Sequence, residues 1–178
     1  MRILWLLIVT LLFISWGQAQ DVASQKRTLK TFKRFYRLND SVYRSEQPGR
    51  KGFQELKSYG IKTVLNLRRL KEDHKKAKHT TLHLEQLRLK SSEIDEQDII
   101  TALRILKEAE KPVLIHCWHG SDRTGVISAA YRIVIEHWPK EKAIAEFRQR
   151  EFGYHENWYP NLVTLLNGLD VAEIRTKL

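Results

Sequence analysis

The chain has 178 residues, one cysteine and a formal net charge of +10 at pH 7. This length suffices for one domain with a core of its own, and no internal repeat or low-complexity linker divides it. A single cysteine excludes an intramolecular disulfide and a cluster of thiolates around a metal. Because no His, Asp and Glu residues have the spacing of a zinc site, we expect no metal ion and no other cofactor.

The N-terminus is predicted to be an export signal. Arg2 precedes an apolar run over residues 3–16, and the tripeptide Gly-Gln-Ala follows it. A short cationic start, an apolar stretch and small residues before a cleavage site are typical of a secretory signal, here predicted to span residues 1–19. The run is shorter than the roughly 20 apolar residues of a membrane span, and retention as an uncleaved anchor is the alternative. We therefore expect an exported protein, periplasmic or secreted.

Basic residues are concentrated in two segments. One is a polar lead-in over residues 20–39, which precedes the domain predicted at residues 40–178, and the other covers residues 68–78. Their charge could attract an anionic substrate or surface, or it could belong to a solvated face without a partner. No nucleic-acid-binding module is recognised in the sequence, so we expect no nucleic-acid partner. We also expect the protein to be a monomer.

Strands and helices are predicted to alternate along the domain. Gly60 is placed to end the first helix, and a slip in the alternation of residues 81–89 predicts a bulge in that strand. Alternation of this kind favours an α/β fold with a small, mostly parallel central sheet flanked by helices. The apolar spacing predicts strands at 42–45, 61–67, 81–89 and 112–115, a charged connection or frayed helix at 71–78, and helices at 51–59, from about 95, at 124–137, at 140–150 and at 158–169.

The segment between the strand at 112–115 and the next helix carries the strongest functional pattern. Residues 116–125 are HCWHGSDRTG, and five residues separate Cys117 from Arg123. A loop of this length can curl into a cup whose backbone N–H groups point inward. The following helix dipole favours a thiolate, and a guanidinium presents a planar fork to two phosphoryl oxygens. The pattern predicts a site that holds a tetrahedral oxyanion against the Cys117 thiolate.

Other loop residues have expected roles of their own. Gly120 and Gly125 would allow a close approach of the backbone or a positive φ. His116 would orient the loop, and a hydroxyl at Thr124 could donate a hydrogen bond to the sulfur. A buried structural cysteine is the alternative for Cys117 taken alone, but the surrounding pattern disfavours it. The residues expected to bind substrate are Trp118, His119, Gly120, Ser121, Asp122, Arg123 and Thr124.

Residues 116–125 resemble the His-Cys-(five residues)-Arg-Ser/Thr signature of cysteine-dependent tyrosine and dual-specificity phosphatases. The resemblance covers roughly residues 40–151 and is closest to exported bacterial TpbA-type enzymes. It implies a dual-specificity phosphatase-like fold, with Cys117 as the nucleophile that forms a phosphocysteine. Arg123 would be the phosphate clamp, and Thr124 would help the sulfur to leave. The implied substrate is phosphotyrosine, with phosphoserine or phosphothreonine, on exported proteins.

The proton donor of this family has no direct counterpart in the chain. Family members take an aspartate from the loop after the preceding strand, but no aspartate directly follows the strand in residues 90–98. Asp95 is the first choice for the general acid, and Glu93 is the second. The alternative role for Asp95 is a helix N-cap. Asp122 could be another donor, or it could brace Arg123 through an ion pair.

Three further functions remain open from the sequence. Cups that contain Asp-Arg-Thr also resemble those of phosphatases that accept phosphoinositides, and the basic surface favours an inositol phosphate as substrate. A catalytically silent phosphate-binding module is a second alternative, although Cys117, Arg123 and Thr124 are intact. A rhodanese-type sulfurtransferase is a third, although its loop is characteristically shorter.

Overall fold

The computed structural model describes residues 23–178, so the predicted export signal lies outside the described residues. Within residues 23–178, no helix combines the length and the apolar character needed to cross a membrane. In chain order the elements are β1 (Gln25–Lys26), β2 (Phe35–Arg37), β3 (Val42–Ser45), α1 (Arg50–Tyr59), β4 (Thr63–Arg68), α2 (His74–Ala77), β5 (His83–Leu89), α3 (Glu96–Glu108), β6 (Val113–His116), α4 (Asp122–Val134), α5 (Lys140–Phe147), η1 (Arg150–Phe152), α6 (Asn161–Gly168) and α7 (Val171–Thr176).

The strands form one sheet in the order β1-β2-β3-β6-β4-β5. β3, β6, β4 and β5 run parallel, whereas β1 and β2 add an antiparallel edge. β6 lies between β3 and β4, so its carboxyl end opens where both neighbouring strands also end. The predicted small, mostly parallel sheet flanked by helices is confirmed.

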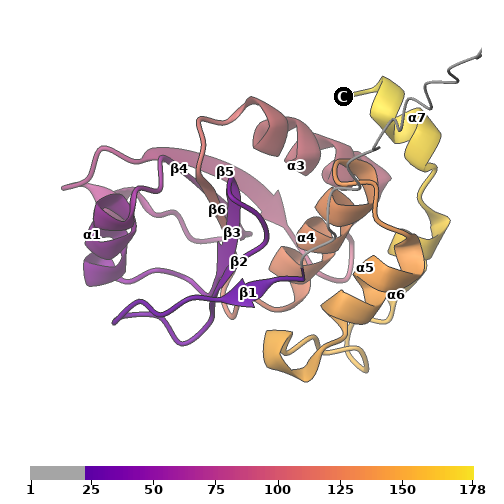
Figure 1. Cartoon of the computed structure of the whole chain (residues 1–178), viewed down its shortest axis with the longest axis horizontal. Helices are drawn as coiled ribbons and strands as arrows, with labels where there is room; N and C mark the ends of the chain where they lie inside the picture. The colour runs from indigo at the N-terminus through magenta and orange to yellow at the C-terminus, as the bar shows by residue number, and fades with distance from the viewer. Residues whose placement is uncertain (1–22) are drawn as a thin grey trace, which may run out of the picture.

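Helices cover both faces of this sheet, α1 on one side and α3 to α7 on the other (Figure 1). Side chains of β6 alternate between the two layers, as the pleat of a strand requires. Leu114 packs with Phe53 and Leu56 of α1, whereas Val113 and Ile115 join the larger core beneath α3 to α7. All of these side chains are almost fully buried. Two apolar layers therefore fix the strand that leads into the site.

Local signals place several elements where the sequence predicts them. Gly60 ends α1 with φ 101°, and its N–H donates to two carbonyls of the last turn. The β4–β5 register shifts between the pairs Asn66–Gln86 and Arg68–Leu89, which puts the extra residue in β5 and confirms the bulge.

Other boundaries differ from the predictions. α4 begins at Asp122 rather than at residue 124, because the Gly125 N–H already donates to the Ser121 carbonyl at 2.6 Å. α6 begins only after Pro160, whose missing N–H suits the start of a helix. α7 continues the chain beyond the last predicted helix.

The basic lead-in is part of the sheet. Its residues supply β1 and β2, and β2 pairs with β3. Phe35 and Tyr36 are buried, and Phe35 stacks on Tyr43 with a centroid distance of 5.4 Å. Residues 25–37 therefore pack as an integral edge of the domain, close to the segment that follows β3.

Candidate active site

The loop between β6 and α4 is the centre of the site. Cys117 follows directly after the end of β6, and it is only 3% exposed. α4 begins at Asp122, so the unpaired N–H groups of its first turn and the positive end of its dipole lie next to the loop. Cys117 thus lies in the short connection between the end of a buried strand and the start of a helix.

The carbonyl oxygens of the loop are occupied by donors from outside it. The Cys117 carbonyl lies 3.0 Å from Nδ1 of His116, which must be the donor because a carbonyl only accepts. The Trp118 carbonyl accepts from the backbone N–H of Gln47 at 3.1 Å. Gln47 follows β3, so the neighbouring strand holds the loop from one side.

Two arginines hold the next two carbonyls. Nη1 of Arg34 donates to the His119 carbonyl at 3.2 Å and to the Ser121 hydroxyl at 2.9 Å. Nη2 of Arg44 donates to the Gly120 carbonyl at 2.8 Å. Arg34 comes from the lead-in just before β2, and Arg44 comes from β3. Both cations therefore contact the outer side of the loop.

Outward carbonyls leave the N–H groups of residues 118–121 pointing inward, because the C=O and N–H of a trans peptide point in opposite directions. Among residues 23–178, none of the turn, loop and cap hydrogen bonds is donated by these four N–H groups. A ring of successive free amides is an anion-binding nest. The loop therefore has the form of the predicted cup, with Cys117 at its start.

Glycine is required at positions 120 and 125 for different steric reasons. Gly120 has φ 74°, and a Cβ there would lie 2.6 Å from the carbonyl atoms of Ser45. A Cβ on Gly125 would instead lie 2.3 Å from the ring of Phe147. Gly120 thus permits the turn of the cup against β3, whereas Gly125 permits α4 to pack on Phe147 of α5.

The guanidinium of Arg123 forms only weak hydrogen bonds within residues 23–178. Its Nη1 lies 3.4 Å from the carbonyls of Leu67 and Leu89, which is long for a hydrogen bond. Among residues 23–178, neither its buried Nε nor the buried Thr124 hydroxyl has a hydrogen-bond partner, so the expected hydrogen bond from Thr124 to the sulfur is not formed. Buried polar atoms of this kind are uncommon. Both groups are free to bind the oxygens of an anion in the cup.

A buried ion network supports the loop from below. His116 Nε2 lies 2.7 Å from Oδ2 of Asp73, whose Oδ1 pairs with Arg68 at 2.6 Å. The His116 ring is thus bound at both nitrogens, with Nδ1 donating to the Cys117 carbonyl and Nε2 paired with the Asp73 carboxyl group. All three side chains are nearly inaccessible to solvent. This charged chain fixes the backbone at Cys117.

Arg44 is a second buried cation behind the cup. Its guanidinium lies 4.3 Å from the centroid of the Phe152 ring. Burial lowers the pKa of Arg44 to about 10, while the charges of Glu146 and Cys117 act in the opposite direction. Arg44 thus stays charged at neutral pH and adds positive potential near the sulfur.

Asp122 ties the start of α4 to the loop that follows η1. Its Oδ1 accepts the backbone N–H of His155 at 2.9 Å, and its Oδ2 lies 3.0 Å from Nδ1 of the same residue. The His155 ring stacks on Trp158 with a centroid distance of 5.1 Å. The Asp122 carboxylate therefore pairs with His155, and no ion pair between Asp122 and Arg123 occurs within residues 23–178.

Comparison with known proteins identifies the chain. A model described as the tyrosine phosphatase family matches residues 30–164. The chain belongs to the tyrosine phosphatase family. It is 30% identical over 164 residues to the dual specificity protein phosphatase TpbA of Pseudomonas aeruginosa, covering 90% of this chain and 70% of that protein. The resemblance seen in the sequence is thus confirmed.

Two further similarities bear on substrate. The chain is 26% identical over 147 residues to the inositol diphosphatase DSP5 of Arabidopsis thaliana, covering 70% of this chain and 69% of that protein. A crystal structure of a cysteine-to-serine variant of P. aeruginosa TpbA in complex with phosphotyrosine superposes with a TM-score of 0.77 at 27% identity, covering 89% and 96% of the two chains.

The predicted acids of this tyrosine phosphatase have other contacts. Asp95 caps α3: it accepts the Asp98 N–H at 2.9 Å, and the Asp98 carboxylate lies 3.4 Å from the Asp95 N–H. Glu93 pairs with Lys90, which lowers the pKa of the Glu93 carboxyl and favours its ionised form. Cys117 lies in the loop before α4 and Arg123 in the first turn of α4, and among residues 23–178 neither Asp95 nor Glu93 has a hydrogen bond or ion pair with them.

Sequence reasoning missed the residues that hold the cup from outside: Arg34, Arg44, Arg68, Asp73 and His155. Arg68 and Asp73 lie in the basic segment over residues 68–78, for which attraction of an anion and a solvated face were both open, yet they form a buried pair. A usable signal existed only for Arg44, a charged residue within the short strand predicted at residues 42–45. No cluster of three or more His, Cys, Asp or Glu side chains in residues 23–178 could hold a metal ion.

Proposed function

We propose that the protein is an exported tyrosine phosphatase that also accepts phosphoserine and phosphothreonine on exported proteins. The observation that carries the proposal is the cup: four inward N–H groups, an arginine with a free Nε, and one sulfur at the end of β6. Such a site binds a phosphoryl group and stabilises its charge during transfer. The similarity to TpbA supports a phosphoprotein as substrate.

The reaction proceeds in two balanced steps. The Cys117 thiolate attacks phosphorus, an S–P bond forms, and the ester P–O bond breaks as the leaving oxygen takes up a proton. Water then attacks the phosphocysteine, the S–P bond breaks, and inorganic phosphate leaves while the thiolate is restored. Arg123 and the inward amides hold the non-bridging oxygens through both steps in this proposal, and Thr124, whose hydroxyl has no hydrogen-bond partner among residues 23–178, is assigned the role of helping the sulfur to leave.

Asp95 is the proton donor in this proposal, and a substitution can separate that role from capping. Asn also caps helices well, so Asp95→Asn should preserve α3. We expect it to slow hydrolysis of phosphotyrosine by about 100-fold or more, because the tyrosine side chain is a poor leaving group that needs a proton. Hydrolysis of p-nitrophenyl phosphate, whose leaving group needs less assistance, should be affected far less. Steady-state kinetics on both substrates measures the difference.

Glu93→Gln and Asp122→Asn serve as comparisons. Their effects on phosphotyrosine should be smaller than that of Asp95→Asn, because Glu93 is held ionised by Lys90 and Asp122 is bound by His155. A larger loss with either would move the donor to that residue. Unchanged rates with all three variants would place the donor outside this set.

A side-by-side substrate panel tests the proposed class. We expect a phosphotyrosine peptide to give the highest kcat/KM, followed by phosphothreonine and phosphoserine peptides. The second candidate is an inositol phosphate, which is favoured by the similarity to DSP5 and by the basic chain. A higher kcat/KM for an inositol diphosphate than for every peptide, measured by phosphate release from one preparation, would replace the protein phosphatase proposal.

Export is proposed from the N-terminal residues 1–19, with the mature phosphatase in the periplasm or the medium. The cationic start and the apolar run support it. A lone cysteine also suits an oxidising compartment, because the chain holds no second thiol that could trap Cys117 in an intramolecular disulfide.

A further inference from the structure

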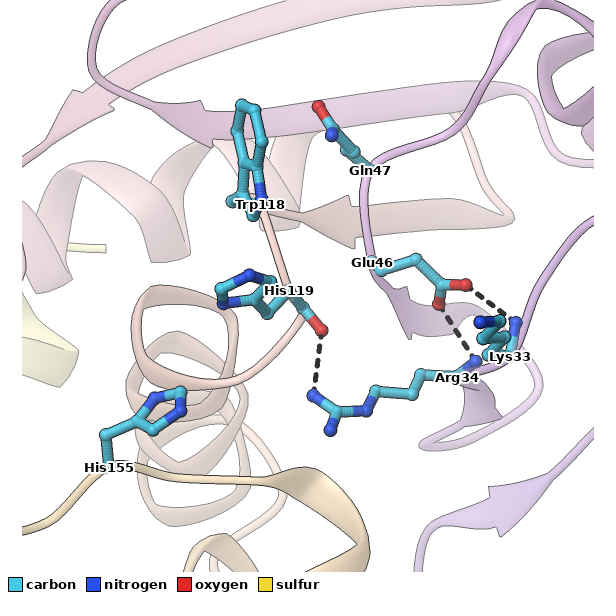
Figure 2. A pocket seen from close by; sticks show the side chains of 7 residues that line it. All are labelled: Lys33, Arg34, Glu46, Gln47, Trp118, His119 and His155. Atoms are coloured by element: carbon cyan, nitrogen blue, oxygen red, sulfur yellow. Dashed lines mark hydrogen bonds between the residues drawn. The ribbon is translucent and has the colours of Figure 1, made fainter.

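A separate hollow of about 520 Å³ adjoins the outer wall of the cup (Figure 2). Sites for small ligands commonly have volumes of this order. Cys117 and Arg123 do not line it, so it is distinct from the phosphate cup. The lining residues are Lys33, Arg34, Glu46, Gln47, Trp118, His119 and His155.

The hollow lies within reach of a substrate held in the cup. Trp118 and His119 directly follow Cys117, and consecutive Cα atoms are about 3.8 Å apart, so the wall at His119 lies within roughly 8 Å of the Cys117 Cα. An extended peptide advances about 3.3 Å per residue. A side chain one or two positions from the phosphorylated residue therefore spans that distance.

Lys33 gives the hollow an available positive charge. Its side chain is exposed, and no hydrogen bond or ion pair of its ammonium occurs within residues 23–178. The nearby carboxylate of Glu46 is engaged by the backbone N–H groups of Lys33 and Arg34, at 2.6 and 2.9 Å. Glu46 thus holds the backbone of the lead-in and leaves the ammonium of Lys33 free for an anionic partner.

Aromatic rings form the remaining wall. Trp118 is 49% exposed, and the ring centroids of His119 and His155 lie 6.1 Å apart with their planes tilted by 60°. Figure 2 shows all three rings along the hollow. The Lys33 ammonium beside aromatic faces fits a carboxylate on a peptide, and the guanidinium of Arg34 adds positive charge to the same lining. A densely phosphorylated inositol fits less well, because the Glu46 carboxylate in the lining would repel additional phosphates.

We propose that this hollow is a specificity subsite for an acidic side chain, Asp or Glu, one or two residues from the phosphotyrosine, with its carboxylate paired to Lys33. The inference rests on the proposed function and adds to it the recognition of residues that flank the phosphotyrosine in the substrate. The subsite lies beside the cup and touches none of the reacting atoms. Its contribution therefore belongs to substrate selection and leaves the chemistry of small aryl phosphates unchanged.

The test uses the full-length protein and three phosphotyrosine peptides that carry Glu, Gln or Lys at the neighbouring positions. We expect wild type to prefer the Glu peptide over the Gln peptide by about fivefold in kcat/KM, the scale of an exposed ion pair. Lys33→Ala should abolish that preference, and Lys33→Glu should reverse it in favour of the Lys peptide. Lys26→Ala, which removes an exposed lysine that does not line the hollow, should retain it.

Hydrolysis of p-nitrophenyl phosphate separates this inference from the proposed function. All three variants should retain the wild-type rate on this substrate, which has no group to place in the hollow. Equal kcat/KM of wild type for the Glu and Gln peptides, or a preference that survives Lys33→Ala, would overturn the subsite. Lys33-dependent hydrolysis of inositol phosphates without peptide preference would also overturn it. A wild type inactive on p-nitrophenyl phosphate would overturn the proposed function itself.

Discussion

Replacement of Cys117 by serine is expected to lower kcat on p-nitrophenyl phosphate by about 10⁴-fold or more. A serine hydroxyl stays protonated at neutral pH, so it cannot replace a thiolate as the nucleophile. The groups proposed to hold the anion are the inward amides of residues 118–121 and the side chain of Arg123, and the substitution removes none of them. Inorganic phosphate should therefore bind to Cys117→Ser with nearly the wild-type affinity, as calorimetric titration would measure.

The outcome separates nucleophilic catalysis from simple anion binding. Thermal unfolding of the variant is the control, because Cys117 is buried and a destabilised loop would also lose activity. Acid-quenched wild-type protein, taken during turnover, should carry a phosphoryl adduct on Cys117 that mass spectrometry detects. Turnover by the serine variant equal to that of wild type would contradict the mechanism and favour a phosphate-binding module with a contaminating activity.

The fold was predictable where its signals are local. Gly60 at the end of α1 and the bulge in β5 each follow from a few neighbouring residues. The mostly parallel sheet was also predictable, because strands that alternate with helices along the chain have few ways to pack. The start of α4 was placed too late because the first turn of the helix lies inside the cup, where Gly and polar residues conceal the apolar period.

The residues that shape the cup were not predictable in the same way. Arg44 and Gly120 are 76 positions apart, and Asp73 and His116 are 43 apart. The sequence around one residue of each pair does not indicate the other residue, because a single charged residue in a loop or strand belongs to no periodic pattern. Only the packing of β3 and of the β4–α2 connection around β6 brings these partners together. One sequence therefore predicts which residues react and leaves open which residues orient them.

Asp122 shows that residues adjacent in the sequence need not form the contact that their charges suggest. Its position next to Arg123 in the sequence suggested an ion pair between neighbours, but successive residues at the start of a helix project in different directions. The structure pairs Asp122 with His155, which is 33 positions away. Within residues 23–178 Arg123 therefore has no carboxylate partner, which agrees with its proposed role in binding a phosphoryl group.

Arg123→Lys is expected to reduce kcat/KM on phosphotyrosine peptides by about 10²- to 10³-fold. The substitution keeps one positive charge but replaces a planar fork with a single ammonium, which cannot hold two oxygens at once. The Nε of Arg123 is buried without a partner, and its contacts to Leu67 and Leu89 are long. Little of the fold depends on these contacts, so the loss should appear in steady-state kinetics with almost no change in the unfolding temperature.

Arg88→Lys supplies a matched comparison, because Arg88 pairs with Glu72 at the surface of β5 and takes no part in the cup. That variant should retain wild-type activity, which would assign the effect at position 123 to the geometry of the fork. If phosphotyrosine is bound through charge alone, Arg123→Lys will retain most of its kcat/KM, and the role of the guanidinium as a two-point clamp will be wrong. A large loss of kcat with a smaller rise in KM would place the clamp's contribution in the transition state, where charge spreads over the oxygens that the fork and the amides hold.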